Sequence, residues 1–188
     1  ASDGVTGLAL TPRMNWTLAT ALANDPDGLL TDLDILAAVA LQVTGSAAID
    51  IGNGALVATV TGVELNLATM DVTDGTTTLT GADILSFTGT ASLFAGVGGS
   101  LNGAHTAVVN GTIGFAVNSV SLSLVSATGA LTDGANAGDS YVGVSVALSD
   151  AQLIGVSGFE LYASGTLKLN SASDGVTGLA LTPRMNWT

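Results

Sequence analysis

Apolar and polar residues alternate with a period of two along most of this chain, which is the pattern of a β-strand with one buried face. Residues 39–43 read Val-Ala-Leu-Gln-Val, and residues 120–124 read Val-Ser-Leu-Ser-Leu. Residues 142–148 and 167–169 continue the alternation. Between such runs lie turn-forming groups, namely Gly52-Asn53-Gly54, Asp74-Gly75, Gly98-Gly99, Asn102-Gly103, Asp133-Gly134 and Asp174-Gly175. The sequence therefore predicts an all-β fold.

Only residues 18–23 and 29–38 have a composition that suits short helices. The second of these follows an Asp-rich loop, and either a short helix or a turn is expected there. Strand and turn are predicted for the rest of the chain.

The chain begins and ends with the same segment. Residues 1–17 read ASDGVTGLALTPRMNWT, and residues 172–188 repeat that order without a mismatch, which gives a period of 171 residues. No strand or turn chemistry demands Pro-Arg-Met-Asn-Trp in this order, so the identity indicates tandem repetition. We expect residues 1–171 to be one complete repeat and residues 172–188 to be the start of the next.

A shorter motif recurs inside this repeat. Val60-Thr-Gly-Val-Glu-Leu65 matches Val156-Ser-Gly-Phe-Glu-Leu161, and residues 5–10 follow the same form. Glycine after a small hydroxyl residue suits a corner between two β segments. Many short strands with frequent corners favour a β-solenoid, continuous between tandem repeats, with coils of roughly 20–30 residues. The absence of a flexible linker at the repeat boundary supports that continuity.

The alternative architecture is a series of tandem antiparallel β-sandwich modules. The Asp-Gly and Asn-Gly pairs favour it, because these are hairpin turns.

Composition narrows the function. Hydrophobic residues form 47% of the chain but aromatic residues only 4%, so its layers are expected to be thin and regular. A net charge of −12 argues against nucleic acid or an anionic membrane surface as partner. The chain contains no run of 18 apolar residues, so no membrane span is predicted. The absence of cysteine excludes disulfides and thiol chemistry.

Several segments resemble giant tandem-repeat cell-surface proteins of environmental bacteria. The segments are residues 82–85, 91–99, 117–124 and 141–170. They resemble very long proteins with an LEPR-XLL-type export segment and large haemagglutinin- or RTX-like adhesins. This resemblance implies an exported, Ca²⁺-rich setting and a role in surface fibres or attachment. Residues 97–102 lack the aspartate of the RTX calcium-binding nonapeptide.

One loop has the composition of a calcium site. Five side chains with oxygen atoms lie within eleven residues around a Gly turn, and they are Asn24, Asp25, Asp27, Asp32 and Asp34. Ca²⁺ takes six to eight oxygen ligands from flexible loops of this kind. The sequence therefore predicts a structural Ca²⁺ site. The other interpretation is a solvated Asp-rich turn in which Asp32 caps a helix.

Other chemistry-bearing residues point away from catalysis. Glu64 and Glu160 occupy equivalent places in the short motif, which favours a ladder or a solvent face over a catalytic pair. His105 is the only histidine, and no cysteine or Ser-His-Asp arrangement accompanies it. Trp16 and its copy Trp187 are expected to pack at a coil end or seam, with sugar binding as the alternative.

The leading hypothesis is a non-catalytic structural repeat of a long extracellular filament or cell-surface fibre. Its expected partners are adjacent repeats of the same chain or identical chains in the fibre. The alternative is the stalk or spacer repeat of a large adhesin that binds glycans or partner cells.

Overall fold

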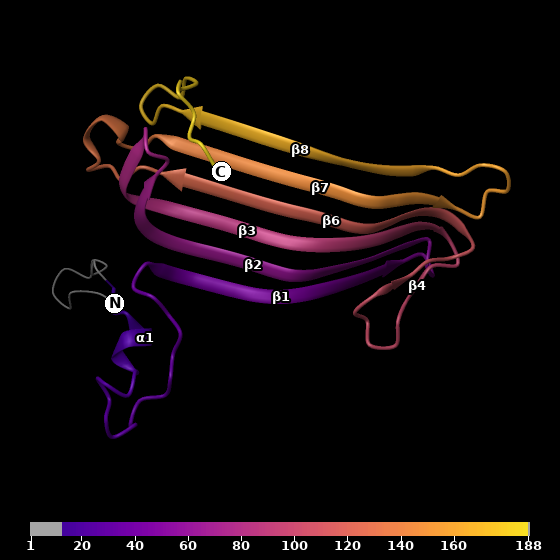
Figure 1. Cartoon of the computed structure of the whole chain (residues 1–188), viewed down its shortest axis with the longest axis horizontal. Coiled ribbons are helices and arrows are strands. Elements are labelled where there is room, and N and C mark those ends of the chain that lie inside the picture. Colours follow the sequence, from indigo (N-terminus) through magenta and orange to yellow (C-terminus); the bar gives the residue numbers. More distant parts are fainter. Residues whose placement is uncertain (1–12, 188) are drawn as a thin grey trace.

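Six long strands form one antiparallel sheet in the computed structural model, which describes residues 13–187 (Figure 1). The order across the sheet is β1-β2-β3-β6-β7-β8, and β4 and β5 form a separate small hairpin. The strands are β1 (Val39–Ile51), β2 (Leu56–Thr73), β3 (Thr78–Val97), β4 (Ser100–Leu101), β5 (Val108–Val109), β6 (Ile113–Thr128), β7 (Ser140–Ile154) and β8 (Tyr162–Ser173). The helical elements of the described part are α1 (Trp16–Ala19) and the 3-10 turn η1 (Gly134–Asn136).

The alternation of the sequence gives the sheet two unlike faces, because neighbouring side chains on a strand point to opposite sides. One row of paired residues across all six strands is wholly apolar and consists of Val43, Leu65, Phe87, Leu124, Val144 and Leu169. The adjacent row, on the opposite face, is wholly polar and consists of Thr44, Glu64, Thr88, Ser123, Ser145 and Lys168. We call these sides the apolar face and the polar face.

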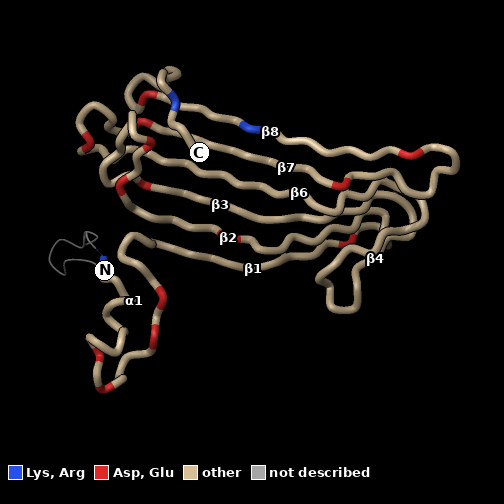
Figure 2. Tube along the Cα trace, in the orientation of Figure 1, with Lys and Arg blue, Asp and Glu red and all other residues tan. Residues whose placement is uncertain are grey.

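Charge lies mostly away from the middle of the sheet. Figure 2 shows most of the acidic residues at the two ends of the strands and in the N-terminal loop, whereas Glu64 lies within β2. Mutual repulsion among carboxylates is lowest where they are spread over solvated turns, and the strand centres stay free for side-chain packing.

The buried side chains cluster at the two ends of the sheet. At one end, Phe94 of β3 is fully buried beside its strand neighbours Val57 and Ala116. Its ring packs against backbone at Gly99 and Gly114, where an added Cβ would lie 2.5 and 2.7 Å from the ring. The other end holds the cluster around Met185 that is described below.

The copies of the short motif take different places. The copy at residues 156–161 lies in the loop between β7 and β8, whereas the copy at residues 60–65 forms no corner, and residues 5–10 lie outside the described part. Val60-Thr-Gly62 lies inside β2, where the pairing with β3 shifts register between Thr61 and Glu64. Gly62 has φ of +59° there, a backbone conformation that glycine adopts without steric cost. The motif is therefore a β-bulge within a long strand, and the corner interpretation is wrong for this copy.

The all-β prediction is confirmed, but the solenoid is not. A solenoid stacks successive coils in parallel, whereas each long strand here pairs antiparallel with the next long strand along the chain. Residues 13–187 form no closed coil. The sandwich alternative was right about antiparallel hairpins, but in the described part the only second sheet is the β4–β5 hairpin.

The two segments whose composition suits short helices, residues 18–23 and 29–38, contain less helix than expected. The first segment contributes only the single turn α1, and its Asn15 side chain accepts the N–H of Leu18 as the N-cap. Residues 29–36 are irregular, and a turn at residues 37–38 leads into β1. Within residues 13–187, no helix has the length and apolar character needed to cross a membrane.

Replacing Phe94 by alanine should lower the free energy of unfolding by about 3–5 kcal/mol, because it leaves a cavity over the glycines. Phe159→Ala is the matched control, since Phe159 is 54% exposed. Urea denaturation of both variants measures the difference. Equal losses from the two variants would show that this end of the sheet is not packed as described.

Candidate functional site

The C-terminal copy of the duplicated segment leaves the end of β8 and folds back over the sheet. Asp174 forms the turn, because its carboxylate accepts the N–H groups of Val176 and Thr177 at 2.9 and 2.6 Å. The chain then returns beside β8, where the N–H of Leu181 donates to the carbonyl of Ala172 at 3.0 Å. This return directs residues 181–187 across the polar face at the end where β8 stops.

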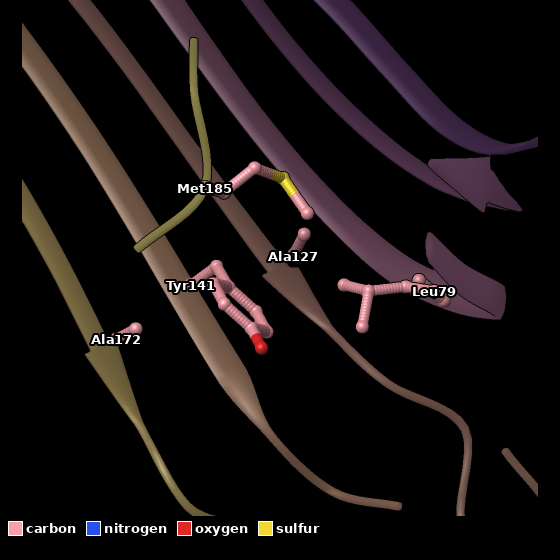
Figure 3. Close-up of a cluster of buried hydrophobic side chains, with 6 residues drawn as sticks. Leu79, Ala127, Tyr141, Ala172 and Met185 are labelled. Atoms are coloured by element: carbon pink, nitrogen blue, oxygen red, sulfur yellow. The ribbon is translucent and has the colours of Figure 1, made fainter. Parts of the chain in front are cut away.

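Met185 fixes this segment to the sheet. Its side chain is 1% exposed and packs in a cluster with Leu79, Ala82, Ala127, Tyr141 and Ala172. Figure 3 shows Met185 on the crossing segment, with its side chain directed at residues of several strands beneath. Methionine suits this place, because its unbranched side chain fills an irregular gap between strands.

Polar contacts hold the backbone on either side of Met185. Asn170 of β8 donates from its amide nitrogen to the Met185 carbonyl at 2.7 Å. The same side chain accepts the indole N–H of Trp187 at 3.2 Å. The indole lies on Gly143 of β7, where an added Cβ would meet the ring at 2.8–2.9 Å. Trp187 therefore packs on the sheet across β7 and β8, where there is no coil end.

A carboxylate from the β2–β3 turn completes the attachment. Asp74 accepts the backbone N–H of Asn186 at 2.7 Å and also those of Thr76 and Thr77 in its own turn. Hydrogen bonds from Thr77, then Asn186, then Thr76 lower the pKa of Asp74 below its ordinary value. Burial raises the pKa of nearby Tyr141, and the negative charges of Asp139 and Asp74 add to this effect.

A shallow cavity of about 450 Å³ lies on the polar face beside Trp187. Its lining includes Ser123, Ser145, Lys168 and Asn170. The amide of Asn170 is already engaged on both sides by the C-terminal copy. The arrangement is thus suited to holding an extended peptide segment against the sheet, by one apolar anchor and flanking hydrogen bonds.

The N-terminal copy, described from Arg13 onward, lies in a different environment. Met14 is 57% exposed and Trp16 is 38% exposed, although their copies Met185 and Trp187 pack on the sheet. The Arg13 guanidinium donates to the Ala38 carbonyl at 3.4 Å, at the start of β1. The same short sequence is therefore docked on a sheet at one end of the chain and only tethered beside β1 at the other.

The structure does not gather the five residues of the predicted Ca²⁺ site. Asp25 is buried and accepts the N–H groups of Leu29 and Leu30 at 3.2 and 2.7 Å. Asn24 donates to the Leu18 carbonyl, and Asp34 accepts the Thr17 hydroxyl.

Asp27 and Asp32 are exposed, and the segment after Asp32 is not helical, so Asp32 caps no helix. Among residues 13–187, no group of three or more acidic or histidine side chains is placed to hold a metal ion. Asp25 has the role of a turn former in this geometry, and Ca²⁺ binding by the loop stays a prediction.

Glu64 and Glu160 do not face each other. Glu64 lies in the polar row of β2 and accepts hydrogen bonds from Asn66 and Gln42, which lower its pKa. Glu160 is exposed in the loop before β8. His105 lies in the exposed loop of the β4–β5 hairpin.

Sequence reasoning singled out the duplicated segment but missed the residues that receive it. Asn170, Gly143 and Asp74 lie on three separate elements, and no local motif connects them. The duplication of a methionine and a tryptophan only two residues apart was the one signal that this segment has a binding partner.

No family model, no curated protein and no solved structure matches this chain.

The two copies provide a matched pair of mutations. Met185→Ala should lower the free energy of unfolding by about 2–5 kcal/mol, because it empties a buried site. Met14→Ala changes the same local sequence at an exposed position and should cost less than about 0.5 kcal/mol. Chemical denaturation of the 188-residue chain measures both. Similar losses in the two variants would contradict the docking of the C-terminal copy.

Acid should weaken this attachment through Asp74. A lowered carboxyl pKa contributes stability that is present above its ordinary value of about 3.9 and is lost as the pH falls through the lowered value. Asp74→Asn should therefore be less stable than the parent chain at pH 7, and the difference should shrink toward pH 3. Urea midpoints at the two pH values test this, with Glu160→Gln as a control for loss of an exposed carboxylate. A difference that is the same at both pH values would count against the charged interaction.

Proposed function

We propose that this chain is a structural, non-catalytic repeat of a long extracellular filament or cell-surface fibre. The observation that carries the proposal is the unequal state of the duplicated segment. Its C-terminal copy is docked on the sheet, whereas Met14 and Trp16 of its N-terminal copy are exposed beside β1. In a tandem array, a single segment would both dock on the sheet of one repeat and lead into β1 of the next, because the end of one repeat is the start of the next.

This design makes the junction part of the fold. Met185 anchors the segment within its own repeat, and the equivalents of α1 and of residues 20–38 lead from it to β1 of the following repeat. At the start of that strand, Arg13 of the N-terminal copy donates to the Ala38 carbonyl. A junction that is fixed to one sheet and tied to the start of the next β1 limits the freedom between repeats, which a straight fibre requires. The extracellular setting rests on the resemblance of residues 82–85, 91–99, 117–124 and 141–170 to giant cell-surface proteins.

The stalk of a large adhesin is the second candidate, and it uses the same physical property. In that case, glycan or cell binding belongs to a module outside these repeats. Trp187 favours the spacer role for the repeat itself, since its indole packs on Gly143 and its N–H is bonded to Asn170.

Electron microscopy of a chain with several consecutive repeats tests the proposal. We expect straight particles with a regular axial repeat of tens of ångströms and a length proportional to the number of repeats. Asp74→Asn in every repeat should increase their bending, because it weakens each attachment. Separate globules on a flexible string would overturn the filament assignment.

A further inference from the structure

We propose that β8 of each repeat pairs along its open edge with β1 of the next repeat, so that one antiparallel sheet runs through the array. This inference rests on the proposed function and adds the surface by which repeats join. The two outer strands, β1 and β8, each have one neighbour in the described sheet. In the described part, the other edge faces no strand along β1 and along most of β8. The last residues of β8 are met by the returning segment, where Ser173 is bridged to Ala180 and the N–H of Leu181 donates to the Ala172 carbonyl.

These edges carry little of the protection that isolated sheets usually have. Natural edge strands are kept from pairing by proline, by several charges, by shortness or by covering segments. β1 and β8 contain no proline, and their only charged residues are Asp50 and Lys168. Both strands are exposed along almost their whole length. Such edges are templates for another strand.

The duplicated segment places the two edges side by side. In its C-terminal copy, the carbonyl of Met185 is held by Asn170 of β8 at 2.7 Å. In its N-terminal copy, Arg13 reaches the Ala38 carbonyl at 3.4 Å and the Thr69 hydroxyl at 3.5 Å, at the start of β1 and the end of β2. The copy of Arg13 is Arg184, the residue just before Met185.

Adjacent residues of one segment thus contact β8 of one repeat and the start of β1 of the next. Arg184 fits this role, because it is exposed and makes no hydrogen bond or ion pair within residues 13–187. Consecutive Cα atoms are about 3.8 Å apart, so the end of β8 and the start of β1 of the next repeat must lie within a few residue lengths of each other.

Strand direction and side-chain facing agree with this pairing. Each strand of the sheet runs antiparallel to its neighbour. Because β8 ends at the side of the sheet where β1 begins, β1 of the next repeat would run antiparallel to β8. A pairing of Val43 near Leu169 keeps the apolar row on one face. It also places Thr44 near Lys168 on the other, with Glu64 one strand further along the same row.

The exposed apolar side chains before β1 fit the same arrangement. Leu22 is 75% exposed and Leu29 is 82% exposed in the segment between α1 and β1. Figure 1 shows this segment beyond the open edge of β1. With β8 of a preceding repeat along that edge, these side chains lie over a neighbouring repeat instead of facing water.

Disulfide trapping in a chain of two consecutive repeats tests the pairing, because the sequence has no cysteine of its own. Leu169→Cys in the first repeat is combined in turn with Leu41→Cys, Val43→Cys or Gly45→Cys in the second, which covers neighbouring registers on one face. At least one combination should form an intramolecular disulfide under mild oxidation, since facing Cβ atoms lie about 4.5–5.5 Å apart. Lys168→Cys with Val43→Cys is the matched control and should not, because the two side chains lie on opposite faces.

Hydrogen exchange on the same two-repeat chain, without cysteines, gives an independent measurement. Segmental isotope labelling distinguishes the repeats. Amides on the outer edge of β8 in the first repeat and of β1 in the second should exchange about tenfold or more slowly than their counterparts at the two ends of the chain. The terminal β1 and β8 have the same sequences and stay unpaired, so they are the internal control.

The outcomes separate this inference from the function it rests on. Edge pairing also requires an axial rise of about 29 Å per repeat, for six strands at about 4.8 Å. If arrays are straight but no same-face pair bridges and the inner edges exchange as fast as the outer ones, edge pairing is wrong and the filament stands. If the arrays are beads on a string, the filament itself is wrong.

Discussion

A sheet of one layer can bury its side chains only where another part of the chain lies on it, and this constraint governs the molecule. The covered places are the two ends. Phe94 closes one end against a glycine-lined loop, and Met185 closes the other by bringing the C-terminal copy across four strands. Between them, order depends on backbone pairing and on rows of side chains within each face. The Met185 contact is therefore as much a part of the fold as any strand.

For the same reason, the stability of the sheet is nearly a sum of contributions from neighbouring strands. Each long strand contacts mainly the strands on its two sides. The stabilising contacts between strands therefore increase with every strand added, while unpaired backbone groups remain only at the two open edges. A single repeat carries two such edges and one unsheltered copy of the duplicated segment. If the edges of consecutive repeats pair as proposed, only the terminal repeats of an array carry these costs, which favours long chains over isolated units.

Much of the fold could be predicted from alternation and turns, and the errors have one physical source. A period of two identifies strands and their faces, but it is the same for parallel and antiparallel neighbours. The decision for a solenoid therefore rested on the short motif, where glycine was interpreted as a corner. At Gly62 the same backbone freedom serves a bulge inside an 18-residue strand. The Asp-Gly pair at Asp74-Gly75 was the better guide, because it lies in the turn between two antiparallel strands.

In the sequence, only the duplicated segment that docks at the candidate site could be recognised, and the residues that receive it could not. Met185 and Trp187 stand in the duplicated segment, while Asn170 and Asp74 are an ordinary strand residue and an ordinary turn residue until the fold brings them together. In the proposed array, this segment contacts one sheet through Met185 and the next through Arg184, so it is constrained from both sides. Most surface segments of a repeat tolerate substitution, but a change at this junction must suit two partners at once.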